Sequence, residues 1–375
     1  MNYRTNPKNG DKISQLGYGC MRFPSSATAG VSDIAEVKRL IKTAFDGGVN
    51  YFDTAFVYGD SEKVLGEVLE DLGIRDKILL STKMPQFSCK SGADFETYFK
   101  KQLAALRVDY VDYLFIHNVS EKKRWDELKS WGILDWIQEK LDKGQAKNVG
   151  FSCHGSTSEF KAILDDHDWD FIMLQYNYLD ENWQVGREGL KYAADKGVPV
   201  FIMEPVRGGL LADKLPPKAK TAFDNLPTKR SYASNAIRWV LDQPEVTMVL
   251  SGMSAFEQVT DNLTTASEIN AGGLTDNERS AYVAAAAAIR EFMDVYCTAC
   301  GYCLPCPKGV SIPDCFYYYN LSFIDDMASV KRNFAGFVGN GNISACVGCK
   351  ACERHCPQSI SIAEKIAAAR TRFGL

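Results

Sequence analysis

The stretch “GGVNYFDTAFVYGDSEKVLG”, Gly47–Gly66, predicts a complete unit of secondary structure in twenty residues. Paired glycines before an apolar run are typical of the end of a helix. The run “VNYFD” that follows has the length of a buried strand, and a loop leads from it into a helical period that begins near Ser61. The stretch therefore predicts the end of one helix, one strand and the start of the next helix.

The same alternation recurs from residue 14 to residue 266. Its eight strand candidates are “QLGYGC”, “VNYFDT”, “ILLSTK”, “VDYLFIH”, “KNVGFS”, “DFIMLQ”, “VPVFIME” and “VTMVLSG”. Eight parallel strands with intervening helices are typical of a closed barrel rather than of an open sheet. We therefore predict an α/β fold, a (β/α)8 TIM barrel, preceded by a short hairpin at “KNGD”, residues 8–11.

The character of the chain changes near residue 295. Thr275 and Glu278 form a capping box, which predicts a helix of about twenty residues through “NERSAYVAAAAAIREFMDVY”. From Cys297 onward the sequence is rich in cysteine, glycine, proline and aromatic residues. We predict two domains, the barrel over residues 1–295 and a small cysteine-rich domain over residues 296–375.

Composition argues against several classes of function. The 375 residues carry a formal net charge of -4 with both signs interspersed, so they offer no basic stripe for nucleic acid. The opening “MNYRTNPKNGDKISQLGYG” has no apolar signal-peptide core, and no run approaches the roughly eighteen apolar residues of a membrane helix. We expect a cytoplasmic protein that binds neither nucleic acid nor a membrane.

Four polar side chains follow consecutive strand candidates, at the end of a barrel where active sites lie. Asp53 ends the second strand candidate and Tyr58 follows it, while Lys83 ends the third and His117 the fourth. A tyrosine, with an ordinary pKa of about 10, needs a nearby cation to stabilise its phenolate, which Lys83 can supply. Asp53 can hold that ammonium in place, and a neutral His117 can donate a hydrogen bond to a carbonyl oxygen. The alternative is that these residues only satisfy loop backbone.

The chain from about residue 14 to residue 266 resembles the aldo-keto reductases. The motif “FDTAFVYGDSEKVLG” has the Asp-x-x-x-x-Tyr-Gly spacing of that family, with the Ser-Glu and Leu-Gly that follow it. The resemblance implies that Asp53, Tyr58, Lys83 and His117 are the catalytic tetrad of an NAD(P)-dependent oxidoreductase. Such an enzyme reduces a small carbonyl compound or oxidises the alcohol. An electron-transfer or binding protein on a barrel that has lost hydride chemistry is the alternative.

The resemblance also implies a nicotinamide cofactor that lies extended across the barrel mouth. Ser152 and Gln175 match residues that hold the carboxamide, and Met203 stands where many members place a stacking aromatic. A thioether can also pack against a ring. The remaining implied contacts are Gly19, Cys20 and Met21, then Arg207, Gly208 and Gly209 for the pyrophosphate, then Ser251, Gly252, Ser254, Gln258 and Asn262 for the adenosine end.

The segment “SGMSAFEQVTDNL”, residues 251–263, has no Arg or Lys to pair with the 2′-phosphate of NADPH. A phosphate without a charge-assisted partner binds less tightly. We therefore expect NADH, or a relaxed preference, rather than strict use of NADPH.

Two cysteine runs predict iron–sulfur clusters. The run Cys346-x2-Cys349-x2-Cys352-x3-Cys356-Pro has the bacterial ferredoxin spacing. The run Cys297-x2-Cys300-x2-Cys303-x2-Cys306-Pro is one residue shorter in its last gap. The resemblance to two-cluster ferredoxins implies two 4Fe-4S clusters, with ligands Cys297, Cys300, Cys303 and Cys356 for one and Cys346, Cys349, Cys352 and Cys306 for the other.

Several alternatives stay open for this second domain. Cys315 is a spare candidate for the position of Cys306, and zinc is the other metal that Cys-x2-Cys pairs bind. Clusters transfer electrons singly whereas nicotinamides exchange them in pairs. The clusters are therefore either structural or suited to exchange with a redox partner protein.

Overall fold

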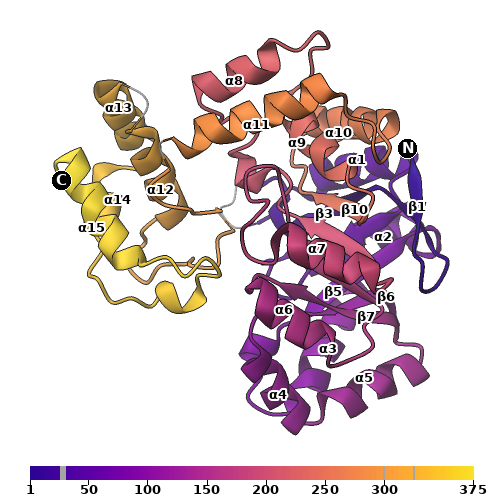
Figure 1. The fold of residues 1–375 in the computed structure, drawn as a ribbon. Coiled ribbons are helices and arrows are strands. Elements are labelled where there is room, and N and C mark those ends of the chain that lie inside the picture. The colour runs from indigo at the N-terminus through magenta and orange to yellow at the C-terminus, as the bar shows by residue number, and fades with distance from the viewer. Residues whose placement is uncertain (26–30, 292, 299, 324–325) are drawn as a thin grey trace. The chain divides into compact units, whose positions relative to one another are not determined.

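The computed structural model describes residues 1–25, 31–291, 293–298, 300–323 and 326–375. Within them, parallel strands close into a barrel in the order β10-β3-β4-β5-β6-β7-β8-β9 (Figure 1). These strands are β3 (Leu16–Gly19), β4 (Tyr51–Asp53), β5 (Leu79–Met84), β6 (Val111–Ile116), β7 (Ala146–Cys153), β8 (Phe171–Gln175), β9 (Val200–Met203) and β10 (Val246–Ser251). The predicted TIM barrel is confirmed.

Helices follow the strands around the barrel, and a hairpin precedes it. In the hairpin, β1 (Tyr3–Thr5) pairs with β2 (Lys12–Ser14) in antiparallel register, as expected at residues 8–11. The helices are α1 (Ile34–Asp46), α2 (Ser61–Leu72), α3 (Ala93–Leu106), α4 (Lys122–Ser130), α5 (Ile133–Asp142), α6 (Thr157–Leu164), α7 (Gly186–Asp195), α9 (Tyr232–Leu241) and α10 (Phe256–Glu268). None of the helices that the structure describes is long and apolar enough to cross a membrane.

Aromatic side chains fill the interior of the barrel. The ring centroids of Tyr113 and Phe171 lie 4.9 Å apart, and those of Tyr51 and Phe201 lie 5.2 Å apart, both with the rings nearly perpendicular. Edge-to-face contacts of this kind add to the burial of apolar area. Because helices cover the outer face of the strands and these rings cover the inner face, the strands are continuous apolar runs rather than alternating ones.

By packing, the chain forms two compact units. The barrel unit comprises Met1–Pro205 and Ser234–Leu274, and the cysteine unit comprises Val206–Ala233 and Thr275–Leu375. The second unit therefore includes a segment that the sequence places between the last two barrel strands. The domain boundary at residue 295 stays a prediction about the sequence, since packing groups residues 206–233 and 275–294 with the cysteines.

The cysteine unit is helical, with its own core. Its helices are α8 (Pro217–Asp224), α11 (Asp276–Arg290), α12 (Ile312–Leu321), α13 (Met327–Phe337), α14 (Asn340–Ser344) and α15 (Ile362–Phe373), with two short 3-10 turns, η4 (Arg207–Gly209) and η5 (Glu353–His355) (Figure 1). Phe316, Phe334, Ile366 and Phe373 form part of one buried cluster. Helix α11 packs on α8, where the rings of Tyr282 and Phe223 lie 5.3 Å apart.

The predicted helix of about twenty residues is wrong in length. Helix α11 has its capping box at Thr275 but ends at Arg290 after fifteen residues. Beyond it, the amides of Asp294 and Val295 donate to Asn320 Oδ1 at 3.0 and 2.9 Å, and Asn320 Nδ2 donates to Val295 O at 2.7 Å. A side chain on α12 therefore takes the backbone groups that a longer helix would have used. Phe292, also in the predicted helix, lies outside the described residues.

Candidate active site and cluster ligands

The C-terminal ends of three neighbouring strands bring together three of the four expected catalytic residues. Asp53 is the last residue of β4, Lys83 the penultimate residue of β5, and His117 follows β6 directly. The amide of His117 donates to Met84 O at 3.0 Å, which continues the β5–β6 ladder by one residue. All three side chains are buried, with at most 4% exposure. Strand register therefore fixes their relative positions.

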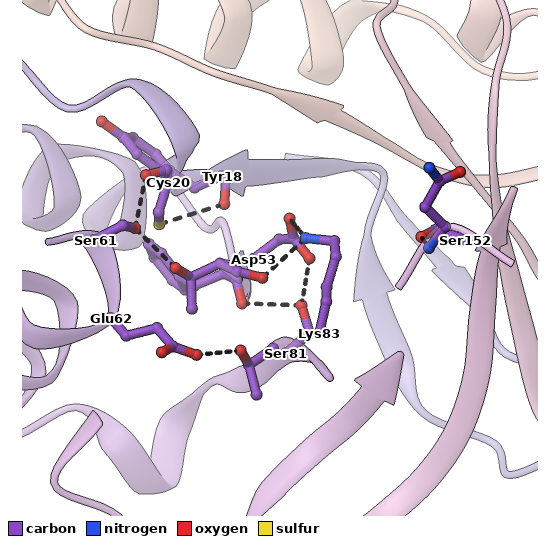
Figure 2. Close-up of polar contacts among 12 residues, drawn as sticks. Tyr18, Cys20, Asp53, Ser61, Glu62, Ser81, Lys83 and Ser152 are labelled. Carbon is purple, nitrogen blue, oxygen red and sulfur yellow. Dashed lines mark hydrogen bonds and ion pairs between the residues drawn. The ribbon is translucent and has the colours of Figure 1, made fainter. Parts of the chain in front are cut away.

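Asp53 and Lys83 form a buried ion pair. Lys83 Nζ donates to Asp53 Oδ2 at 2.5 Å and to Thr54 O at 2.9 Å, and Ser81 Oγ donates to Asp53 Oδ1 at 2.8 Å. Figure 2 shows the two charged groups directed toward each other. Burial raises the pKa of Asp53 and lowers that of Lys83, while their mutual attraction opposes both shifts. A buried pair with its remaining polar atoms hydrogen-bonded keeps both charges.

Tyr58 lies in the loop after β4 and is half-buried. Lys83 Nζ lies 4.8 Å from the centroid of its ring, and the His117 ring meets the Tyr58 ring edge-on at 6.1 Å. Burial raises the pKa of Tyr58 well above its ordinary value, and the carboxylates of Asp53 and Glu204 act in the same direction. This differs from the expectation that Lys83 would stabilise the phenolate. Because Asp53 already balances the charge of Lys83, Tyr58 remains a neutral hydroxyl.

His117 is neutral, as expected. Burial lowers the pKa of His117 well below its ordinary value, and the positive charges of Lys83 and of protonated His154 lower it further. The ring of Phe87 lies 5.4 Å from the imidazole. A neutral imidazole carries one N–H, so it can donate a hydrogen bond to a substrate oxygen near physiological pH.

A buried polar cluster beneath Lys83 was missed in the sequence. Thr82 Oγ1 donates to Glu62 Oε1 at 2.5 Å, and Gln102 Nε2 donates to Glu62 Oε1 at 2.9 Å and to Lys83 O at 3.0 Å. This cluster joins α2, α3 and β5 directly behind the ion pair. The Ser-Glu pair of the motif was a signal for Glu62, whereas Gln102 has none, because a single polar residue in a helix is uninformative.

The expected contacts of the nicotinamide end lie at the ends of β7 and β8. Gln175 is fully buried and its Nε2 donates to Asp180 Oδ2 at 2.8 Å, while its Oε1 has no hydrogen-bond partner among the described residues. A buried acceptor without a donor costs stability, and the amide of a nicotinamide supplies the missing donor. Ser152 Oγ accepts from the amide of Asn118 at 2.8 Å, and Figure 2 shows Ser152 apart from the Asp53–Lys83 pair. Met203 is the register partner of Gln175 on β9 and is half-buried.

The contacts expected along the first and last strands divide into backbone and side-chain features. A Cβ at Gly19 would lie 3.4 Å from Ser251 O, so β3 and β10 approach closely where they end. Asn262 Nδ2 donates to Ser251 Oγ at 2.9 Å, and Gln258 Oε1 accepts from the amide of Ser254 at 2.8 Å. The remaining three are Gly252 beside Gly19, Cys20, which is buried, and Met21, which is 39% exposed.

Arg207, Gly208 and Gly209 belong to the cysteine unit, unlike the other expected cofactor contacts. They form η4, and all three have positive φ, at 49, 63 and 93°. Arg207 is 1% exposed, and its Nη1 lies 3.7 Å from Met293 Sδ. Arg207 and Gly208 line a pocket with Lys214, Cys297 and residues of α12.

The eight cysteines of the two runs gather around two cavities. Cys297, Cys300, Cys303 and Cys356 line the first cavity, and Cys306, Cys346, Cys349 and Cys352 line the second. These are the two sets that two-cluster ferredoxins imply, with the cysteine before each proline crossing to the other set. Cys315 is fully buried, and the structure places it in the lining of neither cavity; its Sγ lies 3.8 Å from Asn342 Oδ1. The residues present therefore fit two cubane clusters.

Comparisons with known proteins agree with these sites. The model of the aldo/keto reductase family matches residues 15–271, and the model of a 4Fe-4S dicluster domain matches residues 296–360. The solved aldo-keto reductase AKR11C1 from Bacillus halodurans, in its holo form, superposes with a TM-score of 0.63 at 26% identity, over 76% of this chain and 96% of that chain.

Characterised and named relatives share the barrel at low identity. L-galactose dehydrogenase from Arabidopsis thaliana is 28% identical over 288 residues, covering 71% of this chain and 88% of its own length. A probable voltage-gated potassium channel subunit beta from Oryza sativa subsp. japonica is 26% identical, covering 70% of this chain and 90% of its own length. With the family model spanning more than half of its length, this chain belongs to the aldo/keto reductase family and carries a 4Fe-4S dicluster domain after the barrel.

Proposed function

We propose that this oxidoreductase uses a nicotinamide cofactor to reduce a small carbonyl compound or to oxidise the corresponding alcohol. The observation that carries the proposal is the buried Asp53–Lys83 pair beside two neutral groups, Tyr58 and His117, at adjoining strand ends. Three of these four side chains are buried, and building this group costs stability that a purely structural role does not require.

The proposed chemistry divides between the cofactor and the chain. A bound nicotinamide supplies or accepts the hydride. Tyr58 donates its hydroxyl proton to the substrate oxygen, and the N–H of neutral His117 holds that oxygen in place. Lys83 offsets the negative charge that forms on Tyr58 as the proton leaves, and Asp53 fixes the ammonium. Gln175 and Ser152 orient the carboxamide, and Gly19 with Gly252 leaves room for a ligand near the backbone.

NADH, or a relaxed preference between NADH and NADPH, remains our proposal for the cofactor. The structure adds one cation that the sequence argument missed, because the guanidinium of Arg39 on α1 lies 4.6 Å from the centroid of the Phe256 ring on α10. Glu36 already binds that guanidinium with two hydrogen bonds, of 2.8 and 2.7 Å. A 2′-phosphate would have to compete with this bidentate pair.

For the second domain we propose two 4Fe-4S clusters with the ligand sets of the two cavities. The cysteine sets leave Cys315 outside, which favours Cys306 as the fourth ligand of the second cluster. We also propose a cytoplasmic location, where thiols remain reduced and available for clusters, and a boundary between the two sequence domains at residue 295.

The test is turnover by the anaerobically purified protein. We expect oxidation of NADH that depends on added carbonyl compound, assayed against a panel of aldehydes and ketones. Tyr58→Phe should lose this turnover by at least about a hundredfold, because general-acid catalysis contributes that much or more. Cofactor binding, followed by intrinsic fluorescence, should stay within about twofold, since little contact surface is removed. Tyr98→Phe, which changes a tyrosine on α3 that packs against Phe56, serves as the matched control.

Retained turnover in Tyr58→Phe would overturn the assignment of the tetrad. Cofactor binding by the wild type without turnover of any carbonyl or alcohol would favour a barrel that has lost hydride chemistry.

A further inference from the structure

The two cysteine cavities differ in charge and in exposure. None of the described residues that line the first cavity is charged, and its walls include Thr298, Phe316 and Gln358, which are 1, 0 and 7% exposed. Lys308 and Lys350 line the second cavity. A cluster in the first cavity is therefore enclosed by neutral, buried groups, whereas a cluster in the second lies beside two cations.

The second cavity also reaches the surface. Cys349 is exposed, whereas the other seven cysteines of the two runs are partly buried. Val347, which lines the same cavity, is 64% exposed, far more than an apolar side chain needs to be in a packed loop. Exposed apolar side chains beside a functional group are typical of contact sites.

The cavities of the cysteine unit adjoin one another in order. Ile312 and Ile362 line both cysteine cavities, so only these side chains separate them. Cys297 and Pro313 line both the first cavity and the pocket of Arg207 and Gly208. A charge that enters at the second cavity therefore has a route to the first cavity, and then to the edge of that pocket, inside one packed unit.

The surface near the second cavity is cationic in an acidic chain. The formal net charge of the whole chain is -4, yet the two cysteine runs contain Lys308, Lys350 and Arg354 against one acid, Glu353. Glu353 Oε1 accepts from the amide of Ala363 at 2.9 Å, where it caps the start of α15. We call Lys308, Val347 and Lys350 the carrier patch.

We propose that an acidic one-electron carrier protein docks on the carrier patch and exchanges electrons with the second cluster. The inference rests on the proposed two clusters. In the reducing direction the carrier loses one electron and the cluster gains it, with no bond made or broken; in the oxidising direction the electron returns. Positive groups at the rim attract an acidic partner and raise its association rate. The apolar Val347 contributes the contact that ions alone do not give.

The experiment measures reduction of the cluster-loaded full chain by a small acidic 2Fe-2S ferredoxin, which serves as the probe. Reduced probe and oxidised protein are mixed anaerobically, and the second-order rate constant is followed over a range of ionic strength. For the wild type we expect this rate constant to fall as salt is added, because salt screens the attraction. Lys308→Glu with Lys350→Glu should lower it at least about tenfold at low salt, and the two proteins should converge at high salt.

Matched variants separate docking from damage to the clusters. Lys331→Glu changes an exposed lysine on α13 that lines neither cavity, and should react within about twofold of wild type. The neutral pair, Lys308→Gln with Lys350→Gln, should give an intermediate rate constant. Iron content and the number of electrons taken up from dithionite should equal those of wild type in every variant.

The proposal is overturned if the doubly reversed variant reacts at the wild-type rate with its iron intact, if Lys331→Glu slows the reaction as much, or if salt accelerates the wild type. Fewer than two clusters in the wild type would instead contradict the proposed function, and iron analysis detects that outcome separately.

Discussion

Burial raises the pKa of Tyr58, and Asp53 and Glu204 reinforce the shift, while burial lowers the pKa of His117. Both side chains are therefore uncharged over a wide range of pH. The one strong charge pair of the site, Asp53 with Lys83, is internally balanced and buried. Single residues of this site thus differ in task, because the ion pair sets position and charge balance while the neutral groups handle the proton.

These directions predict a pH profile. Carbonyl reduction needs protonated Tyr58 and neutral His117, so kcat/KM should be flat from pH 6.5, the ordinary pKa of histidine, to pH 10, that of tyrosine. The sign follows because a raised tyrosine pKa keeps the proton above pH 10 and a lowered histidine pKa keeps the ring neutral below pH 6.5. Alcohol oxidation needs the phenolate and should rise through the same range. A reduction rate that falls between pH 7 and pH 9 would contradict this.

The buried pair predicts a stability cycle. Lys83→Met should lower the free energy of unfolding of the barrel unit by about 3–5 kcal/mol, since it leaves a buried carboxylate uncompensated. Asp53→Leu with Lys83→Met should cost less than the sum of the two single changes. The exposed control Lys63→Met on α2 should stay within about 0.5 kcal/mol. Denaturant unfolding followed by tryptophan fluorescence measures all four variants, and additive costs would show that the pair is not coupled.

At the scale of elements, side chains from one element fix the backbone of another. Gln102 on α3 holds the carbonyl of Lys83 on β5, and Asn320 on α12 holds the backbone of residues 294–295 after α11. Each makes several hydrogen bonds across a long separation in sequence. A buried polar side chain that satisfies backbone groups in this way determines where an element ends and how a neighbour lies against it.

Asn320 gives the prediction at this scale. Asn320→Ala should leave two amides and one carbonyl unpaired, at about 1–3 kcal/mol for each that stays buried, and should loosen the start of the first cysteine run. We expect iron loss under mild heating well before wild type, with unchanged tryptophan fluorescence. Asn333→Ala, at an exposed position on α13, is the matched control. Equal iron retention in the two variants would show that the contact has no role in holding the run.

At the scale of the whole molecule, the two units carry separate reporters. All six tryptophans, at positions 125, 131, 136, 169, 183 and 239, lie in the barrel unit. The eight cluster cysteines lie in the cysteine unit. Fluorescence therefore follows one unit and visible absorption of iron–sulfur clusters follows the other, so the stability of each unit can be measured in the intact chain.

This separation predicts the effect of metal removal. Anaerobic protein should contain about eight irons and eight acid-labile sulfides, four of each per cubane. Oxidation with a chelator should bleach the clusters and unfold α12 to α15, because the clusters link the cysteine runs, while the fluorescence transition of the barrel stays in place. Zinc, or about four irons, would refute the two-cluster proposal. Collapse of the barrel together with the clusters would show that the two units are not independent.

The sequence by itself determined the features that depend on local period and spacing. Short apolar runs that alternate with helical periods specified the barrel, the four catalytic candidates follow its strands directly, and the cysteine spacings specified the dicluster domain. These are readable because each lies within a contiguous segment, where period and spacing set which face a residue occupies.

Only the tertiary structure decided which distant groups meet. It assigned the charge of Lys83 to Asp53 rather than to Tyr58, placed Gln102 behind the site, ended α11 early, and grouped Arg207 with the cysteines. Each outcome depends on packing between segments far apart in the chain. Burial there changes pKa values and hydrogen-bond partners by amounts that exceed the preferences of any local pattern, so no spacing in the sequence could have revealed them.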